Sequence, residues 1–182
     1  MIINSKSDKK SSQDRLFLPT VSAGAEYLVM GYLMRRNIMT YKAPPNNAGY
    51  DLICIHPDPR HKSSNKEKER VLIQVKSRYQ TDSNMSFPIK ESSLNAFDFL
   101  VVTFLNIGNF YGKNVGLDGM AEPVFYTLPN EFIKLHHNKS TSWQKVSLKK
   151  VKNEIEIYKN ENGFEQIVQA LGISKPIKIK KT

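Results

Sequence analysis

The chain has 182 residues, 40% of them hydrophobic, which is enough for one ordinary core but leaves little for a second independent domain. No stretch reaches the ~18 uninterrupted apolar residues of a membrane span, and residues 1–13 lack the apolar centre of a secretory signal. A membrane protein is therefore excluded, and we expect a soluble, cytoplasmic protein.

The charge balance is strongly basic, with 27 Lys and Arg against 17 Asp and Glu, a formal net charge of +10. Such an excess attracts polyanions, of which nucleic acid is the commonest inside cells. Some of the lysines lie near the two ends, where they also fit simple solvated termini. We expect a mobile basic arm over residues 1–18, a single domain over 19–173 and a basic C-terminal tail over 174–182.

The first periodic segment, Ser22 to Arg36, predicts a helix with Thr20 or Ser22 as its N-cap. Glu26 lies on the same helical stripe as apolar residues four and seven positions later. A carboxylate on an apolar stripe needs a partner.

Three strands are predicted next, a short one from Ile38 to Lys42 and two longer ones at Gly49–Ile55 and Arg70–Ser77. The two longer strands form an antiparallel pair joined by the polar stretch 57–69. That stretch is either a solvated hairpin tip or a finger that touches phosphates.

Alternation along these two strands gathers polar groups on one spot of the sheet. Asp51 shares a face of its strand with Ile53 and Ile55, and Leu72, Gln74 and Lys76 share a face of the next. Buried ionisable groups cost several kcal/mol unless they are paired or bound to an ion, so a specific use of this cluster is expected.

The remaining chain predicts a strand buried on both faces and an amphipathic helix near the end. The predicted elements are a turn of helix at Ser92–Leu94, the buried strand Phe97–Leu105, a strand Val124–Leu128, a helix from Pro129 to His136 with Asn130 as its cap, an edge strand Trp143–Leu148, and a helix with Phe164, Ile167, Val168 and Leu171 on its apolar face, ended by Gly172. Cys54, between two isoleucines, is interpreted as a core residue.

The order of a helix with Glu26, a strand with Asp51 and a strand with Gln74-Val75-Lys76 resembles the core of the PD-(D/E)XK nuclease superfamily. That superfamily includes restriction enzymes, Holliday-junction resolvases and some homing endonucleases. The resemblance covers roughly residues 20–105 and implies an α/β fold with a restriction-endonuclease-like mixed β-sheet flanked by helices. Gln74 stands where most members have an acid, as in a homing-endonuclease-like variant.

Phosphodiester hydrolysis requires a cation at the scissile phosphate, and Mg²⁺, with Mn²⁺ as a substitute, takes carboxylate and carbonyl oxygens. Asp51 is the expected main ligand, beside the Gln74 side chain and the Val75 carbonyl, with Glu26 reaching the ion directly or through water. Lys76 is expected to orient or polarise the attacking water. These residues predict a magnesium-dependent DNA endonuclease, in which Gln74 weakens the metal site.

Other interpretations stay open. Asp51 and Lys76 also fit an ordinary cross-strand ion pair, and the chain also fits a noncatalytic nucleic-acid-binding module or a protein that binds a protein partner. A histidine metal site is disfavoured because the spacing of the two candidate pairs, His56 with His61 and His136 with His137, matches no zinc pattern.

Contacts to the phosphates of DNA or RNA are expected from basic residues near the hairpin and just after Lys76. These candidates are Lys62, Lys66, Lys68, Arg70 and Arg78. A homodimer or higher homo-oligomer is expected if both strands of a duplex are cut, because one site cleaves one strand at a time.

Overall fold

The computed structural model describes residues 20–47, 49–79, 85–107, 121–139 and 144–174. The predicted basic arm and, except for Ser174, the predicted C-terminal tail lie outside these residues. None of the helices in the described ranges is both long and apolar enough to cross a membrane.

The centre of the fold is a mixed β-sheet, which within the described residues has five strands in the order β1-β2-β3-β5-β6. Its strands are β1 (Met39–Lys42), β2 (Leu52–Ile55), β3 (Arg70–Arg78), β5 (Phe99–Phe104) and β6 (Val124–Pro129). β2 and β3 form the predicted antiparallel pair, whereas β3 and β5 run parallel. The predicted mixed sheet flanked by helices is confirmed.

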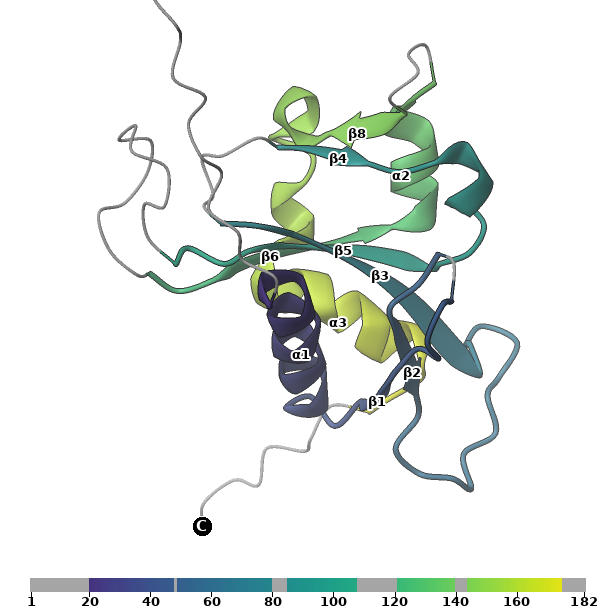
Figure 1. Ribbon diagram of the computed structural model, residues 1–182. Helices are drawn as coiled ribbons and strands as arrows, with labels where there is room; N and C mark the ends of the chain where they lie inside the picture. Colours follow the sequence, from purple (N-terminus) through teal and green to yellow (C-terminus); the bar gives the residue numbers. More distant parts are fainter. Residues whose placement is uncertain (1–19, 48, 80–84, 108–120, 140–143, 175–182) are drawn as a thin grey trace, which may run out of the picture.

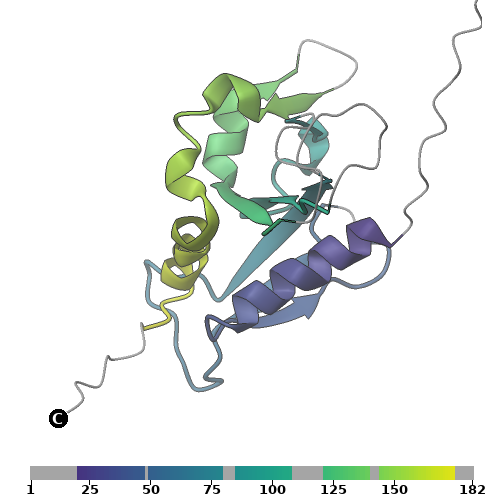
Figure 2. The same cartoon turned by 90° about the vertical axis from the view of Figure 1, so that its left-hand side faces the viewer.

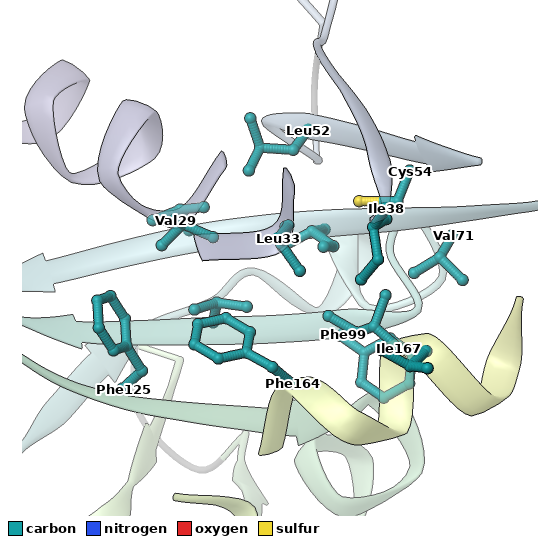
Figure 3. Close-up of a cluster of buried hydrophobic side chains, with 14 of the residues drawn as sticks. Val29, Leu33, Ile38, Leu52, Cys54, Val71, Phe99, Phe125, Phe164 and Ile167 are labelled. Carbon is teal, nitrogen blue, oxygen red and sulfur yellow. The ribbon is translucent and has the colours of Figure 1, made fainter. Parts of the chain in front are cut away.

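Two helices cover one face of this sheet, α1 (Val21–Met34) and α3 (Asn160–Ala170) (Figure 1). Figure 3 shows Val29 and Leu33 of α1 and Phe164 and Ile167 of α3 gathered with Leu52 of β2. These side chains form one buried cluster, so the apolar sides of both helices pack on the same face of the sheet.

A second layer covers the opposite face (Figure 1). It consists of α2 (Asn130–His136), a small sheet in the order β4-β8-β7, and three short 3₁₀ helices. Their bounds are β4 (Ser86–Pro88), β7 (His137–Asn138), β8 (Lys145–Ser147), η1 (Glu91–Ser93), η2 (Leu148–Val151) and η3 (Glu156–Tyr158). Every residue of β5 is buried because both layers pack on that strand, which confirms the predicted doubly covered strand.

Two sequence predictions about this second layer were wrong. The strand expected as an edge at Trp143–Leu148 is β8, which pairs with β4 on one side and β7 on the other. The sequence did not reveal its partner strands, because β4 and β7 are too short to show an alternation of apolar and polar residues. Asn130 does not cap α2 with its side chain; its amide nitrogen donates to the main-chain carbonyls of Leu94 and Phe97 instead.

Candidate functional site

Asp51 closes the hydrogen-bond ladder between β2 and β3. Its main-chain N–H donates to the Ile73 carbonyl at 2.7 Å, and its carboxylate Oδ2 accepts the Val75 N–H at 2.7 Å. The carboxylate thus takes the place of a main-chain partner just before β2 begins, since the paired register stops at Leu52 and Ile73. Oδ1, the second carboxylate oxygen, makes no hydrogen bond or ion pair within the described residues.

The turn before Asp51 depends on Gly49, whose φ is +119°, a backbone conformation that other residues rarely adopt. A Cβ at this position would lie 2.3 Å from the Cβ of Ala96. The Asn47 side chain donates to the Tyr50 carbonyl at 2.7 Å and fixes the same turn. The turn that precedes Asp51 is therefore fixed both by the close approach of Gly49 to Ala96 and by the Asn47 hydrogen bond.

Gln74 and Lys76 point to the face of β3 opposite α1. They align with Leu100 and Val102 of β5, which belong to the apolar cluster of the second layer. Asp51 is hydrogen-bonded to Ile73 and Val75, the two chain neighbours of Gln74, so this part of β3 lies beside Asp51. The predicted convergence of Gln74 with Lys76 follows from this alternation.

The Gln74 side chain carries an unsatisfied oxygen. Its Oε1 atom is shielded from water and has no hydrogen-bond partner among the described residues. Buried polar atoms are nearly always paired, so such an atom calls for a water or an ion as its partner.

Lys76 is half-buried and makes no ion pair or hydrogen bond with the residues that the structure describes. In particular, no ion pair joins it to Asp51, so the ordinary cross-strand pair considered from the sequence is not formed among them. The ammonium group is therefore available to an anion that arrives from outside the protein.

Glu26 approaches from the other side of the sheet. It belongs to α1, whose buried residues Ala25, Val29 and Leu33 pack on the face opposite Gln74. Its carboxylate forms an ion pair with Lys42 of β1. Within the described residues nothing links Glu26 directly to the Asp51 carboxylate, although Lys42 aligns with Leu52, the next residue along the chain.

The residues present fit part of a divalent-cation site. Oδ1 of Asp51 and Oε1 of Gln74 have no partner among the residues that the structure describes. The Val75 carbonyl lies on the same side of β3 as the Val75 N–H. It is two residues beyond Ile73, the last residue of β3 that pairs with β2. A hard cation such as Mg²⁺ takes carboxylate, amide and main-chain oxygens of this kind. No group of three or more His, Cys, Asp or Glu suited to a metal occurs in the described ranges, so neutral oxygens would have to complete the set.

The basic residues predicted to touch phosphates fall into two groups. Lys62, Lys66 and Arg70 are exposed, but they lie at or beyond the end of β2 that is remote from Asp51, where Arg70 aligns with Ile55. The polar stretch 57–69 packs beside the end of α3, with the Lys68 N–H donating to the Ala170 carbonyl at 2.7 Å (Figures 1 and 2).

The other two basic candidates are bound within the protein. Lys68 donates from its amine to Asp98 at 2.8 Å, and this hydrogen bond raises the pKa of the lysine. Arg78 is half-buried over the Phe87 ring, with its guanidinium carbon 4.4 Å from the ring centroid. It also donates to the Ser86 carbonyl at 2.5 Å, and burial lowers the pKa of its guanidinium.

Two of the histidines, His56 and His61, stack on each other. The rings of His56 and His61 are 3.8 Å apart, and Nε2 of His61 lies 3.3 Å from Glu67. Cys54 is fully buried, as predicted, and burial raises the pKa of its thiol to about 12. Neither feature contributes to the group formed by Asp51, Gln74, Val75 and Lys76, called the Asp51 cluster below.

Sequence reasoning missed the residues that organise this region from a distance. Lys42, the last residue of the strand predicted at 38–42, forms an ion pair with Glu26. The Asp98 carboxylate accepts a hydrogen bond from the Leu72 N–H at 2.7 Å. The only signal for Asp98 was a lone acid inside an apolar run.

No protein-family model matches the sequence, and no curated protein matches it. Among solved structures, the bacterial homing endonuclease I-Ssp6803I is similar to this chain, with 16% sequence identity and a TM-score of 0.45. The match covers 83% of this chain and 91% of that chain.

Proposed function

We propose that this protein is a DNA endonuclease that hydrolyses phosphodiester bonds with a divalent cation, Mg²⁺ or Mn²⁺, held at Asp51. The observation that carries the proposal is the set of oxygens near the start of β2 that have no partner in the described part of the chain, above all Oε1 of Gln74. A water-shielded oxygen without a partner costs free energy, and a bound cation removes that cost.

Asp51 would hold the ion with Oδ1 while Oδ2 stays on the Val75 N–H, so the ligand is fixed by the strand itself. Gln74 and the Val75 carbonyl would supply neutral oxygens. When bound, the cation neutralises charge on the scissile phosphate and lowers the pKa of a bound water. Lys76, uncommitted among the described residues, would hold that water and offset the negative charge that develops in the transition state.

Glu26 receives a secondary role. Because its carboxylate is paired with Lys42 on the opposite side of the sheet, it would act through water or by fixing the position of β1. Its removal should therefore reduce the cleavage rate less than removal of Asp51.

A noncatalytic nucleic-acid-binding module is the second candidate. It is favoured by the single carboxylate of the cluster, because each missing negative charge weakens cation binding. Such a protein would bind DNA equally well with and without divalent cations.

The decisive experiment incubates supercoiled plasmid with the protein and Mg²⁺ or Mn²⁺ and compares three variants. Asp51→Asn keeps an oxygen for the Val75 N–H and removes the charge, so it should abolish cleavage. Lys76→Met should slow cleavage by roughly 100-fold to 1000-fold. Glu26→Gln should cause a smaller loss than either.

Matched controls are Asp58→Asn, a partly exposed acid in the loop after β2 that pairs with Arg60, and Lys152→Met, an exposed lysine after η2. Both should cleave as the unaltered protein does. Absence of cleavage in the unaltered protein, or full cleavage by Asp51→Asn, would contradict the proposal. A conversion of nicked to linear plasmid that depends on protein concentration would support the proposed homodimer.

A further inference from the structure

A cavity of about 300 Å³ lies beside the small sheet. None of the candidate metal ligands discussed above lines it. Polar side chains from five elements line it, namely Ser86 of β4, Lys145 and Ser147 of β8, Asn138 of β7, His136 of α2 and Lys150 of η2. Phe87, which follows Ser86, and its cross-strand partner Val146, which lies between Lys145 and Ser147, are fully buried in the apolar core. The cavity therefore lies on the outer face of the small sheet.

The lining is rich in hydrogen-bond donors and positive charge. Lys145 and Lys150 make no ion pair within the described residues, in contrast to Lys139, which pairs with Glu91. The Ser86 and Ser147 hydroxyls lie 3.4 Å apart across the β4 and β8 pair. Among the residues that the structure describes, no carboxylate lines the cavity.

One acid approaches this group of side chains, Glu154, whose carboxylate lies 3.4 Å from Nε2 of His136. Glu154 is exposed, so water screens its charge at the lysines. Two ammonium groups beside two hydroxyls and an amide match a phosphate, which carries negative charge on several acceptor oxygens.

The position of the cavity relates it to the Asp51 cluster. The small sheet covers the same face of the large sheet to which Gln74 and Lys76 point. Arg78, two residues beyond Lys76 on β3, donates to the carbonyl of Ser86, which lines the cavity. The two sites thus share one layer and a direct structural connection.

We propose that this cavity binds a phosphate group of a nucleic-acid backbone. The net charge of +10 favours a polyanion as the source of that phosphate. The inference goes beyond the proposed function, because the cavity binds without cleaving and would do so in a protein with no hydrolytic activity.

The test measures binding of a short fluorescein-labelled DNA duplex by anisotropy at several salt concentrations, with EDTA present to exclude hydrolysis. The variant Lys145→Gln/Lys150→Gln is compared with Lys149→Gln/Lys152→Gln, which makes the same charge change at exposed neighbouring lysines outside the cavity. Lys150→Gln alone, at an exposed position, guards against a folding defect in the double variant.

The cavity variant should bind the duplex roughly tenfold more weakly, and the slope of log K against log salt should fall by about 1, as expected for one lost phosphate contact. The control should change both quantities less. Equal affinities and slopes for cavity variant and control would overturn the proposal.

A second arm titrates inorganic phosphate and follows the main-chain amide signals of Ser86, Lys145 and Ser147 by NMR. Shifts at these residues together with weakened duplex binding by the cavity variant support the backbone-phosphate assignment. Shifts without any loss of duplex binding would assign the cavity to a small phosphorylated ligand and overturn the proposal.

Discussion

The side-chain oxygen of Gln74 is shielded from water in the middle of β3, a position where an apolar residue would pack without cost. An unsatisfied buried acceptor destabilises a folded protein by about 1–3 kcal/mol. A binding site tolerates such a cost, because a ligand that supplies the missing partner binds more tightly by the same amount.

Replacing Gln74 by Met should therefore stabilise the metal-free protein by about 1 kcal/mol or more, since Met has a similar length and no buried oxygen. The same variant should lose the additional stability that Mg²⁺ gives to the unaltered protein. Urea unfolding with and without Mg²⁺ measures both effects. A destabilised metal-free variant would show that Gln74 has a partner after all.

Cys54 should be almost inert to thiol reagents in the folded protein. Burial raises the pKa of its thiol from 9.0 to about 12, so at pH 8 the reactive thiolate is about 1000-fold rarer than in the unfolded chain. The stability that this neutral thiol contributes is complete below pH 9 and falls as the pH rises toward 12. Labelling at pH 8 should be fast only after denaturation; rapid labelling of the folded protein would contradict this.

Asp51, Gln74 and Lys76 could be chosen from the sequence because strand alternation is local and assigns faces without tertiary information. The partner of Glu26 could not be predicted in the same way. Whether Glu26 meets Lys42 or Asp51 depends on how α1 lies across the sheet, which is decided by the packing of Ala25, Val29 and Leu33.

At the scale of elements, long strands and helices with clear periodicity were predictable, including β3, β5 and α3. The small sheet was not, because its three strands contain only two or three residues each. Its stability comes from Phe87 and Val146 on the core face and from neighbouring segments, none of which leaves a periodic signal.

Asn130 joins α2 to the segment before β5, so its loss should be costly. Asn130→Ala leaves the buried carbonyls of Leu94 and Phe97 without their donor, and should destabilise the protein by about 2–3 kcal/mol. Asn95→Ala, at an exposed position in the same segment, should change stability by less than about 0.5 kcal/mol. Similar losses in the two variants, measured by urea unfolding, would argue against this role.

The turn before Asp51 should tolerate no side chain at Gly49. Gly49→Ala requires a positive φ and a displacement of Ala96, which together should cost about 1–3 kcal/mol and shift the Asp51 carboxylate. Gly31→Ala, in the interior of α1 with open space around it, should instead stabilise by about 0.5–1 kcal/mol. Thermal unfolding of the pair checks the sign of both changes.

At the scale of the described molecule, the large sheet lies between two layers, α1 with α3 on one face and the small sheet with α2 on the other. The chain has a net charge of +10, and the second layer, which holds the donor-lined cavity, covers the face of the large sheet to which Gln74 and Lys76 point. The composition indicated an affinity for polyanions, but the cavity could not be predicted. Its lining residues come from five elements that lie up to 64 positions apart, because Ser86 is at one end and Lys150 at the other.

Binding of a divalent cation at Asp51 is tested most directly by titrating isotope-labelled protein with Mn²⁺ and recording NMR spectra. We predict that the main-chain amide signals of Asp51 and Val75 broaden first, that those near Lys150 persist, and that Asp51→Asn but not Asp58→Asn removes the effect. Broadening centred on His56 and His61, or no broadening at all, would contradict the account.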